Sequence, residues 1–228
     1  AQNLPPYPWF WAGVIAALYG RTAKCIVLDL DNTLWGGVVG DDGVENLRIG
    51  EGDAESEAFK TFQEYLRALK QRGIVLAVSS KNEEDNALAP FERLPEMVLK
   101  RADFVAFKAN WRPKPEALEE IARELNIGLE AIVFVDDNPA ERELVRRALP
   151  AVRVVELSSD PTDYPRLLDQ SGWLETVRLT EEDQRKTEQY LENLQRGSLA
   201  AQHADYGAYL ASLEQRADLR PFEPDTLD

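Results

Sequence analysis

The stretch that most constrains the fold of this chain runs from Lys24 to Leu34 and reads Lys-Cys-Ile-Val-Leu-Asp-Leu-Asp-Asn-Thr-Leu. An unbroken run of Ile, Val and Leu is typical of a strand buried on both faces of a parallel sheet. Such a strand ends at the carboxyl edge of the sheet, where open α/β folds bind their ligands. Asp29 and Asp31 would lie together at that edge, and neighbouring carboxylates repel each other unless a cation or a proton separates them. Asp-x-Asp-x-Thr at this place therefore predicts the nucleophile strand of a phosphoryl-transfer site.

Further apolar runs alternate with helical patterns along the chain. Strands are expected over 25–29, 74–78, 104–107, 131–135 and 152–155. Helices are expected over 9–19, 56–70, 115–125 and 139–149, and several short helices within 83–101. Strands separated by helices imply right-handed crossovers and a parallel sheet covered by helices. The predicted fold class is α/β, a Rossmann-like core with a five-stranded parallel sheet. Asp42-Gly43 between apolar flanks predicts a small β-hairpin flap.

The chain is expected to divide into a catalytic core and flanking parts. An N-terminal arm and helix cover 1–22, and the core covers 23–158. A C-terminal helical extension packing on the core is expected over 159–216. Residues 217–228 resemble the start of a truncated following unit or a linker, so we expect a piece of a larger multidomain polypeptide.

Charge and cysteine content exclude several classes of function. The formal net charge of −15 argues against a general nucleic-acid or anionic-membrane binder. The single cysteine, Cys25, excludes an internal disulfide and fits a reducing, cytoplasmic location. The apolar stretch 9–19 lacks a basic leader and is too short to span a bilayer.

Polar residues follow the later strands, as the two aspartates follow the first. Ser80 ends the second strand, Asp136 and Asp137 end the fourth, and Lys114 opens a helix. An aspartate can attack phosphorus, and a second carboxyl can protonate the leaving oxygen. A hydroxyl, an ammonium and a hard cation stabilise charge on the phosphoryl oxygens, and carboxylates suit Mg²⁺. Each residue alone has an ordinary structural explanation, such as a turn cap or a solvated charge; together they predict one site.

Four segments in this order resemble the four motifs of the haloacid dehalogenase (HAD) superfamily of phosphotransferases. These are Asp29-Leu30-Asp31-Asn32-Thr33, Ser80, Lys114-Pro115 and Asp136-Asp137. Residues 29–40, 80–82 and 133–143 resemble, more narrowly, the FkbH-like subfamily of polyketide biosynthesis. The resemblance covers about residues 24–215. It implies an enzyme that takes D-1,3-bisphosphoglycerate, removes phosphate and loads the glyceryl unit onto the phosphopantetheine thiol of an acyl carrier protein.

The resemblance also assigns roles to residues. It implies that Asp29 is the nucleophile and a ligand of Mg²⁺, and that Asp31 is the general acid/base with its carbonyl facing the metal. Asp136 and Asp137 would complete the metal site. Substrate or phosphate binding is implied for a larger set, which comprises Thr33, Trp35, Gly36, Gly37, Ser80, Lys81, Asn82, Arg112 and Lys114.

One position departs from the subfamily pattern. The residue before Ser80 is commonly Cys there and is thought to carry the acyl group, whereas this chain has Ser79. A serine hydroxyl is a weak nucleophile without an adjacent base. Cys25 is a poor substitute because it lies inside a buried strand. The transfer half of the implied activity depends on this position, and the phosphatase half does not.

Spacing and local charge bear on the partner. The segments after the first and second strands are too short for a large cap domain, which suits a substrate delivered on a long arm by a carrier protein. Carrier proteins are usually acidic, and residues 98–114 hold five basic residues against one acidic residue, so this stretch is a candidate for phosphate or carrier recognition. Two alternatives stay open. One is a plain phosphatase of a small metabolite, and the other is a catalytically idle carrier-docking domain.

Overall fold

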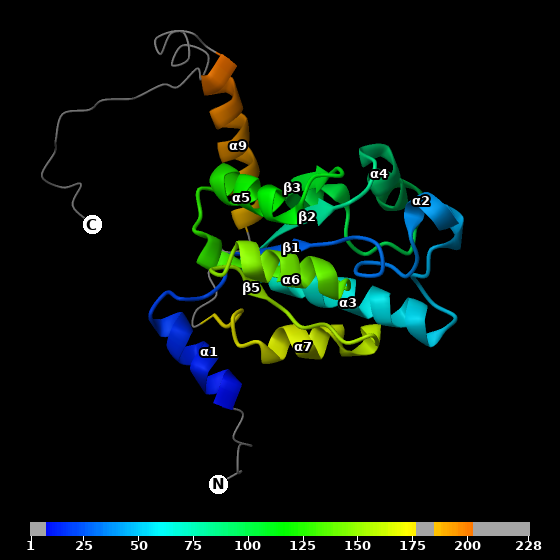
Figure 1. The fold of residues 1–228 in the computed structure, drawn as a ribbon, viewed down its shortest axis with the longest axis horizontal. Helices are drawn as coiled ribbons and strands as arrows, with labels where there is room; N and C mark the ends of the chain where they lie inside the picture. The colour runs from blue at the N-terminus through cyan, green and yellow to red at the C-terminus, as the bar shows by residue number, and fades with distance from the viewer. Residues whose placement is uncertain (1–7, 177–184, 203–228) are drawn as a thin grey trace, which may run out of the picture. The chain divides into compact units, whose positions relative to one another are not determined.

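The computed structural model describes residues 8–176 and 185–202, which form a parallel sheet covered by helices (Figure 1). The five strands are β1 (Cys25–Leu28), β2 (Val75–Ser80), β3 (Phe104–Ala109), β4 (Ile132–Val135) and β5 (Arg153–Val154). Their order in the sheet is β3-β2-β1-β4-β5, and all neighbouring pairs are parallel. The predicted α/β fold with a five-stranded parallel sheet is confirmed.

At least one helix lies between each pair of successive strands, as connections between parallel strands require. The helices before β4 are α1 (Pro8–Leu18), α2 (Val39–Asp42), α3 (Ala54–Gln71), α4 (Glu84–Arg93) and α5 (Lys114–Leu125). After β4 come α6 (Pro139–Ala148), α7 (Tyr164–Gln170) and α9 (Lys186–Gln202). α3 packs against α7, and α5 packs against α6. Among the residues described, no helix is long and apolar enough to cross a membrane.

The helix α3 shows how the sequence produces these elements. Asp53 caps its amino end by accepting hydrogen bonds from the backbone N–H groups of Glu55 and Ser56. Its apolar residues recur at helical spacing, so one face is buried in the core with Phe59 and Phe62. The helix ends before Gly73, whose φ of 89° only glycine adopts readily.

The predicted β-hairpin at Asp42-Gly43 is wrong. Residues 39–42 form the short helix α2, and a 3-10 turn follows at Val44–Asn46. The carboxylate of Asp42 accepts a hydrogen bond from the backbone N–H of Val38 (2.7 Å), which favours a helical turn over a two-residue hairpin. Between 29 and 53, antiparallel pairing is limited to one bridge between Gly36 and Arg48.

The connections after β1 and β2 contain no separate domain. Between β1 and β2 lie α2, the 3-10 turn and α3, and between β2 and β3 lie α4 and a second 3-10 turn at Arg101–Asp103. All residues of these two connections are described. The predicted absence of a large cap therefore agrees with the elements found there.

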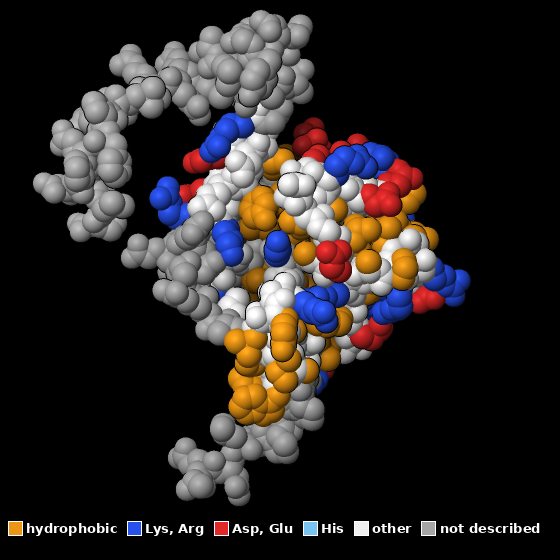
Figure 2. Space-filling model, turned by 90° about the vertical axis from the view of Figure 1, so that its left-hand side faces the viewer, with side chains coloured by type: hydrophobic (Ala, Val, Ile, Leu, Met, Phe, Trp, Pro, Cys, Tyr) orange, Lys and Arg blue, Asp and Glu red, His pale blue; other side chains and the backbone are white. Residues whose placement is uncertain are grey.

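The helix α1 approaches the core closely at Gly13, where an added Cβ would lie 2.6 Å from the carbonyl oxygen of Gly172. Its other side is apolar and exposed (Figure 2).

The chain forms two compact units, 1–190 and 191–228. The part of the predicted helical extension after Gln202 and the unit predicted for 217–228 lie outside the described residues, and the predicted domain boundaries stay predictions.

Candidate active site

Three carboxylates meet at the carboxyl edge of the sheet. β1 and β4 pair with Leu28 beside Val135, so the next residues, Asp29 and Asp136, lie side by side. One carboxylate oxygen from each of Asp29, Asp136 and Asp137 lies within 4.8 Å of the other two. Parallel strands bring this about because their carboxyl ends meet at the same edge.

A buried ammonium group lies among these carboxylates. Lys114 opens α5 and is only 3% exposed. Its Nζ lies 2.6 Å from Asp136 Oδ2 and 2.8 Å from Asp29 Oδ1. A buried lysine is stable only when anions compensate its charge, so Lys114 and the two aspartates hold one another in place.

The pKa values reflect an excess of negative charge at this edge. Burial alone would lower the pKa of Lys114, but Asp29 and Asp136 outweigh it and leave that pKa raised. Burial, and then the charge of Asp29, raises the pKa of Asp136 and of Asp137 to about 6. One ammonium does not neutralise three carboxylates, and a further cation would.

The donor set fits a hard divalent cation. Asp29 Oδ1 is buried and has no hydrogen-bond partner among the described residues, because its approach to Lys114 lacks hydrogen-bond geometry. Three carboxylates with spare acceptor capacity form the kind of oxygen site that Mg²⁺ prefers, with water filling its other positions. Asp29, Asp136 and Asp137 are the residues that would hold it.

Asp31 is held by three hydrogen-bond donors. Its Oδ1 accepts from Trp35 Nε1 (3.0 Å) and from the backbone N–H of Val39 (3.1 Å), and its Oδ2 accepts from Asn82 Nδ2 (2.7 Å). Burial raises the pKa of Asp31, and these hydrogen bonds only partly oppose it. A carboxyl with a fixed orientation and a raised pKa suits a general acid/base.

The loop that carries Asp136 and Asp137 is fixed from two directions. The backbone N–H of Asp137 donates to Thr33 Oγ1 (3.1 Å), which ties this loop to the one after β1. The buried guanidinium of Arg142 donates to the carbonyl oxygens of Asp136 (2.8 Å) and Asp137 (2.7 Å). Arg142 therefore supports the carboxylates without contacting the cavity.

Comparison with known proteins agrees with this geometry. Residues 37–148 match the family model of the haloacid dehalogenase-like hydrolases. The chain carries a haloacid dehalogenase-like hydrolase domain. The matched segment includes Lys114, Asp136 and Asp137. It begins after Asp29 and Asp31, and these two residues are placed in the candidate site by the geometry described above.

One solved structure is similar over most of the chain. It is the N-terminal part of the protein BF1531 from Bacteroides fragilis, containing a phosphatase domain complexed with Mg, at 51% identity and a TM-score of 0.72. The alignment covers 74% of this chain and 45% of that one, so this chain spans less than half of that structure. No curated protein matches the chain.

Two more distant structures also match. A HAD family enzyme from Bacteroides thetaiotaomicron, in complex with magnesium and inorganic phosphate, is 13% identical with a TM-score of 0.40, and the alignment covers 60% of this chain and 95% of that one. A 3-deoxy-D-manno-octulosonate 8-phosphate phosphatase from Moraxella catarrhalis is 16% identical with a TM-score of 0.38, covering 88% and 99%. At these TM-scores neither carries an argument about this chain.

The candidate active-site cavity has a volume of about 180 Å³. Most of the predicted catalytic and metal residues contribute to its wall. The lining comprises Asp29, Asp31, Asn32, Lys81, Lys114, Asp136, Asp137, Asn138 and Glu141.

Several predicted substrate residues lie behind this wall. Trp35 is fully buried and, with Asn82, orients Asp31. Thr33 contacts Asp137, and the N–H of Gly37 donates to Asn32 Oδ1 (2.9 Å). Gly36 pairs with Arg48, and an added Cβ would lie 2.8 Å from the ring of Phe59. Their predicted role in binding substrate stays a prediction, and the contacts described here are supporting ones.

Ser79 and Ser80 are both buried at the end of β2, 2% and 4% exposed. Neither is among the residues that line the cavity. Within the described part of the chain, neither hydroxyl has a hydrogen-bonded base. Ser79 therefore lacks the activation that an acyl-carrying serine needs.

The basic stretch 98–114 is largely neutralised. Lys108 forms ion pairs with Glu120 and Glu124, and Arg112 pairs with Glu116 and Glu120. Lys114 is buried in the active site. Three of the five basic residues are therefore paired or buried, whereas Lys100 and Arg101 are exposed, and recognition of a phosphate or a carrier by this stretch stays a prediction.

Sequence reasoning assigned no role to Glu141 or Arg142. Both lie in the first turns of α6, after the Asp-Asp-Asn-Pro segment whose Asn138 caps that helix. The available signal was a charged pair, Glu141-Arg142, four residues after the two aspartates that are predicted to bind metal. The roles of these two residues depend on their ion-pair partners, Lys81 for Glu141 and Glu156 for Arg142, which are not their neighbours in the sequence.

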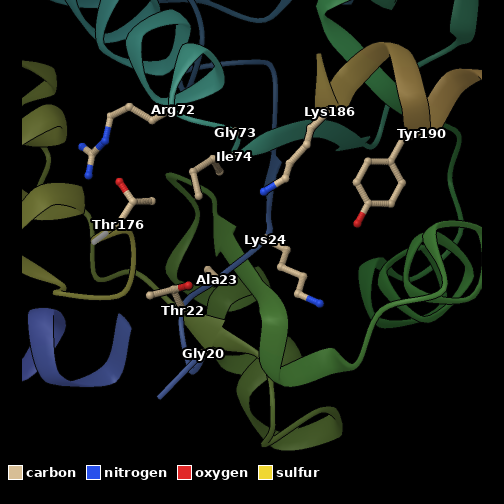
Figure 3. A pocket seen from close by; sticks show the side chains of 10 residues that line it. All are labelled: Gly20, Thr22, Ala23, Lys24, Arg72, Gly73, Ile74, Thr176, Lys186 and Tyr190. Atoms are coloured by element: carbon tan, nitrogen blue, oxygen red, sulfur yellow. The ribbon is translucent and has the colours of Figure 1, made fainter. Parts of the chain in front are cut away.

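A second cavity, of about 310 Å³, lies at the opposite, amino-terminal edge of the sheet (Figure 3). Lys24, Arg72 and Lys186 line it together with the hydroxyl groups of Thr22, Thr176 and Tyr190, and its lining also includes Gly20, Ala23, Gly73 and Ile74. Over residues 8–176 and 185–202, no carboxylate belongs to that lining. This cavity is larger than the one at the carboxyl edge, but its described lining lacks the carboxylates on which the predicted phosphoryl transfer depends.

Proposed function

We propose that this chain is a Mg²⁺-dependent HAD-type glyceryl transferase/phosphatase that uses Asp29 as its nucleophile. Its substrate would be D-1,3-bisphosphoglycerate, and its acceptor would be the phosphopantetheine thiol of an acyl carrier protein. The observation that carries the phosphatase half is the cluster of Asp29, Asp136, Asp137 and Lys114 beside the hydrogen-bonded Asp31. The sequence resemblance to FkbH-like proteins supports the transfer half.

The residues fit the steps of phosphate removal. The carboxylate of Asp29 attacks phosphorus, the bond from phosphorus to the leaving oxygen breaks, and Asp31 donates a proton to that oxygen. Asp31 then takes a proton from water, which attacks the phospho-aspartate and releases inorganic phosphate and free Asp29. Lys114 neutralises phosphoryl oxygens throughout. Mg²⁺ held by Asp29, Asp136 and Asp137 would supply further charge stabilisation at those oxygens.

Two features support an acceptor that arrives on another protein. The connections after β1 and β2 contain no cap domain, so a long phosphopantetheine arm has a path to the cavity. The site also lies at the carboxyl edge of the sheet, where the loops after the strands and the amino ends of α5 and α6 line it. Transfer consists of thiol attack on the acyl phosphate carbon, formation of the thioester and departure of phosphate.

A plain phosphatase of a small phosphorylated metabolite is the second candidate. The burial of Ser79 favours it, since no activated acyl carrier is left. The ion pairs of Lys108 and Arg112 favour it as well, since they reduce the basic surface available for docking. An idle docking domain is disfavoured, because it has no use for a buried Lys114 among carboxylates.

The test is intact-protein mass spectrometry after incubation with Mg²⁺ and freshly generated 1,3-bisphosphoglycerate, with and without a phosphopantetheinylated carrier protein. The wild type, Ser79→Cys and Asp29→Asn are compared. We expect a glyceryl adduct on Ser79→Cys that passes to the carrier, and no phosphate release by Asp29→Asn. Phosphate release without acylation of any form or of the carrier would leave the phosphatase and eliminate the transferase.

A further inference from the structure

Two side chains of opposite charge line the active-site cavity without belonging to the catalytic cluster. Lys81 follows β2 and Glu141 lies in the first turn of α6. Lys81 Nζ donates to Glu141 Oε1 at 2.5 Å. The side chain of Lys81 is 38% exposed and that of Glu141 is 15% exposed, so the pair joins two separate elements at the wall of the cavity.

The second carboxylate oxygen of Glu141 is buried and has no hydrogen-bond partner among the described residues. Leaving a buried acceptor unpaired is unfavourable, because the group loses its hydrogen bonds to water and gains none in return. The amino end of α6 favours a negative charge at Glu141, which reduces this cost without supplying a donor. The missing donor is therefore best supplied by a molecule bound in the cavity.

The chemistry of the cavity restricts that donor. A phosphoryl group beside Asp29 and Lys114 occupies much of a space of about 180 Å³, so only a small attached group reaches Glu141. An anionic group there would be repelled by Glu141, and an apolar group would leave Oε2 unpaired. A hydroxyl group donates one hydrogen bond to this oxygen without bringing charge.

We propose that Glu141 is a specificity-determining residue that accepts a hydrogen bond from a hydroxyl group of the substrate, and that Lys81 is the positioning residue that holds its carboxylate. This inference rests on the proposed phosphatase function and narrows the substrate class to small phosphate compounds with a hydroxyl group near the phosphate. The glyceryl unit, with its hydroxyl at the second carbon, belongs to this class.

The test compares sn-glycerol 3-phosphate with n-propyl phosphate, which has the same carbon chain without the hydroxyl groups. We expect wild-type kcat/KM to favour glycerol phosphate by about tenfold or more, because a site built to bind a hydroxyl discriminates against the analogue that lacks it. Glu141→Met removes the acceptor at similar size, and we expect the preference to disappear. Lys81→Met should reduce the preference in part, since Glu141 then loses its support.

The matched control is Glu143→Met. Glu143 lies on the same helix, pairs with Arg146 and Arg147, and does not line the cavity. The same comparison is made without turnover by titrating both phosphates into Asp29→Asn by calorimetry in the presence of Mg²⁺. Equal preference in the wild type, or an equal loss for both substrates in Glu141→Met, would overturn the inference while the phosphatase function stands. Absence of phosphate release from every substrate, the bisphosphate included, would overturn the proposed function and the inference with it.

Discussion

The two edges of the sheet carry opposite charges and different kinds of space. The strand β1 begins next to Lys24 at the basic amino edge and ends next to Asp29 at the acidic carboxyl edge. The amino edge has the larger cavity, about 310 Å³ against about 180 Å³. Its cations lie next to hydroxyl groups, whereas the ammonium of the carboxyl edge is buried between carboxylates.

In this comparison the candidate active site is distinguished by its convergent charged groups and not by its volume. At the carboxyl edge, burial raises the pKa values of Asp31, Asp136 and Asp137, and Lys114 compensates part of the charge. At the amino edge, Arg72 donates to the carbonyl oxygen of Leu174 and lies 3.7 Å from Glu175, which are ordinary structural contacts. Substitutions at the two edges should therefore have unequal effects.

The largest expected difference is in turnover. Asp29→Asn should lower kcat for phosphate release by at least about 10⁴-fold, because the amide cannot act as the nucleophile. Lys24→Gln at the amino edge should change kcat by less than about twofold, since surface substitutions away from a site alter free energies by within about 0.5 kcal/mol. Steady-state phosphate release measures both. Comparable losses in the two variants would show that the amino edge takes part in catalysis.

The next difference is in stability without metal. Lys114→Met should lower the free energy of unfolding by about 3–5 kcal/mol, because it leaves the buried carboxylates of Asp29 and Asp136 uncompensated. Lys24→Met should lower it by less than about 0.5 kcal/mol, because this lysine is exposed. Urea denaturation in the presence of a metal chelator measures the free energy of unfolding of both variants. A Lys114→Met protein as stable as the wild type would contradict the role of Lys114 as the internal counter-ion.

The smallest expected effect depends on pH. The pKa of Asp137 is about 6 in the folded protein, above its ordinary value near 3.9. Its protonation therefore favours folding, and that contribution is lost as the pH rises from about 4 through about 6. In a chelator at about pH 7.5, Asp137→Asn should raise Tm by about 2–4 °C, corresponding to about 1 kcal/mol.

The increase in Tm caused by Asp137→Asn should be smaller at about pH 5, where the carboxyl of Asp137 in the wild type is largely protonated. Adding Mg²⁺ at neutral pH should reverse the order of the two proteins, because the wild type keeps a ligand that the variant lacks. Thermal denaturation at the two pH values provides the measurement. A Tm difference that does not vary with pH would argue against repulsion among these carboxylates in the metal-free protein.

The strands and the nearness of the catalytic carboxylates were predictable because they follow from local pattern and one topological rule. Apolar runs such as 25–28 and 132–135 can only be buried strands here, and parallel strands bring their carboxyl ends together. The short helix at Asp42-Gly43, where a hairpin was expected, was not predictable in this way. The Asp-Gly pair favours a hairpin turn, whereas the hydrogen bond from the backbone N–H of Val38 to the Asp42 carboxylate favours a helical turn. The sequence pattern does not show which of the two is stronger.

The sequence by itself determined the order of strands and helices, the residues that end β1 and β4, and the chemistry that two neighbouring aspartates make possible. Only the tertiary structure decided which residues reach the cavity and which support it. Trp35 donates a hydrogen bond to Asp31 from the core. Arg112 forms ion pairs with Glu116 and Glu120. Glu141 lines the cavity and forms an ion pair with Lys81. The physical reason is that the positions of strands and helices along the chain follow from local hydrophobic periodicity, whereas a charged side chain takes its role from partners that only folding brings near.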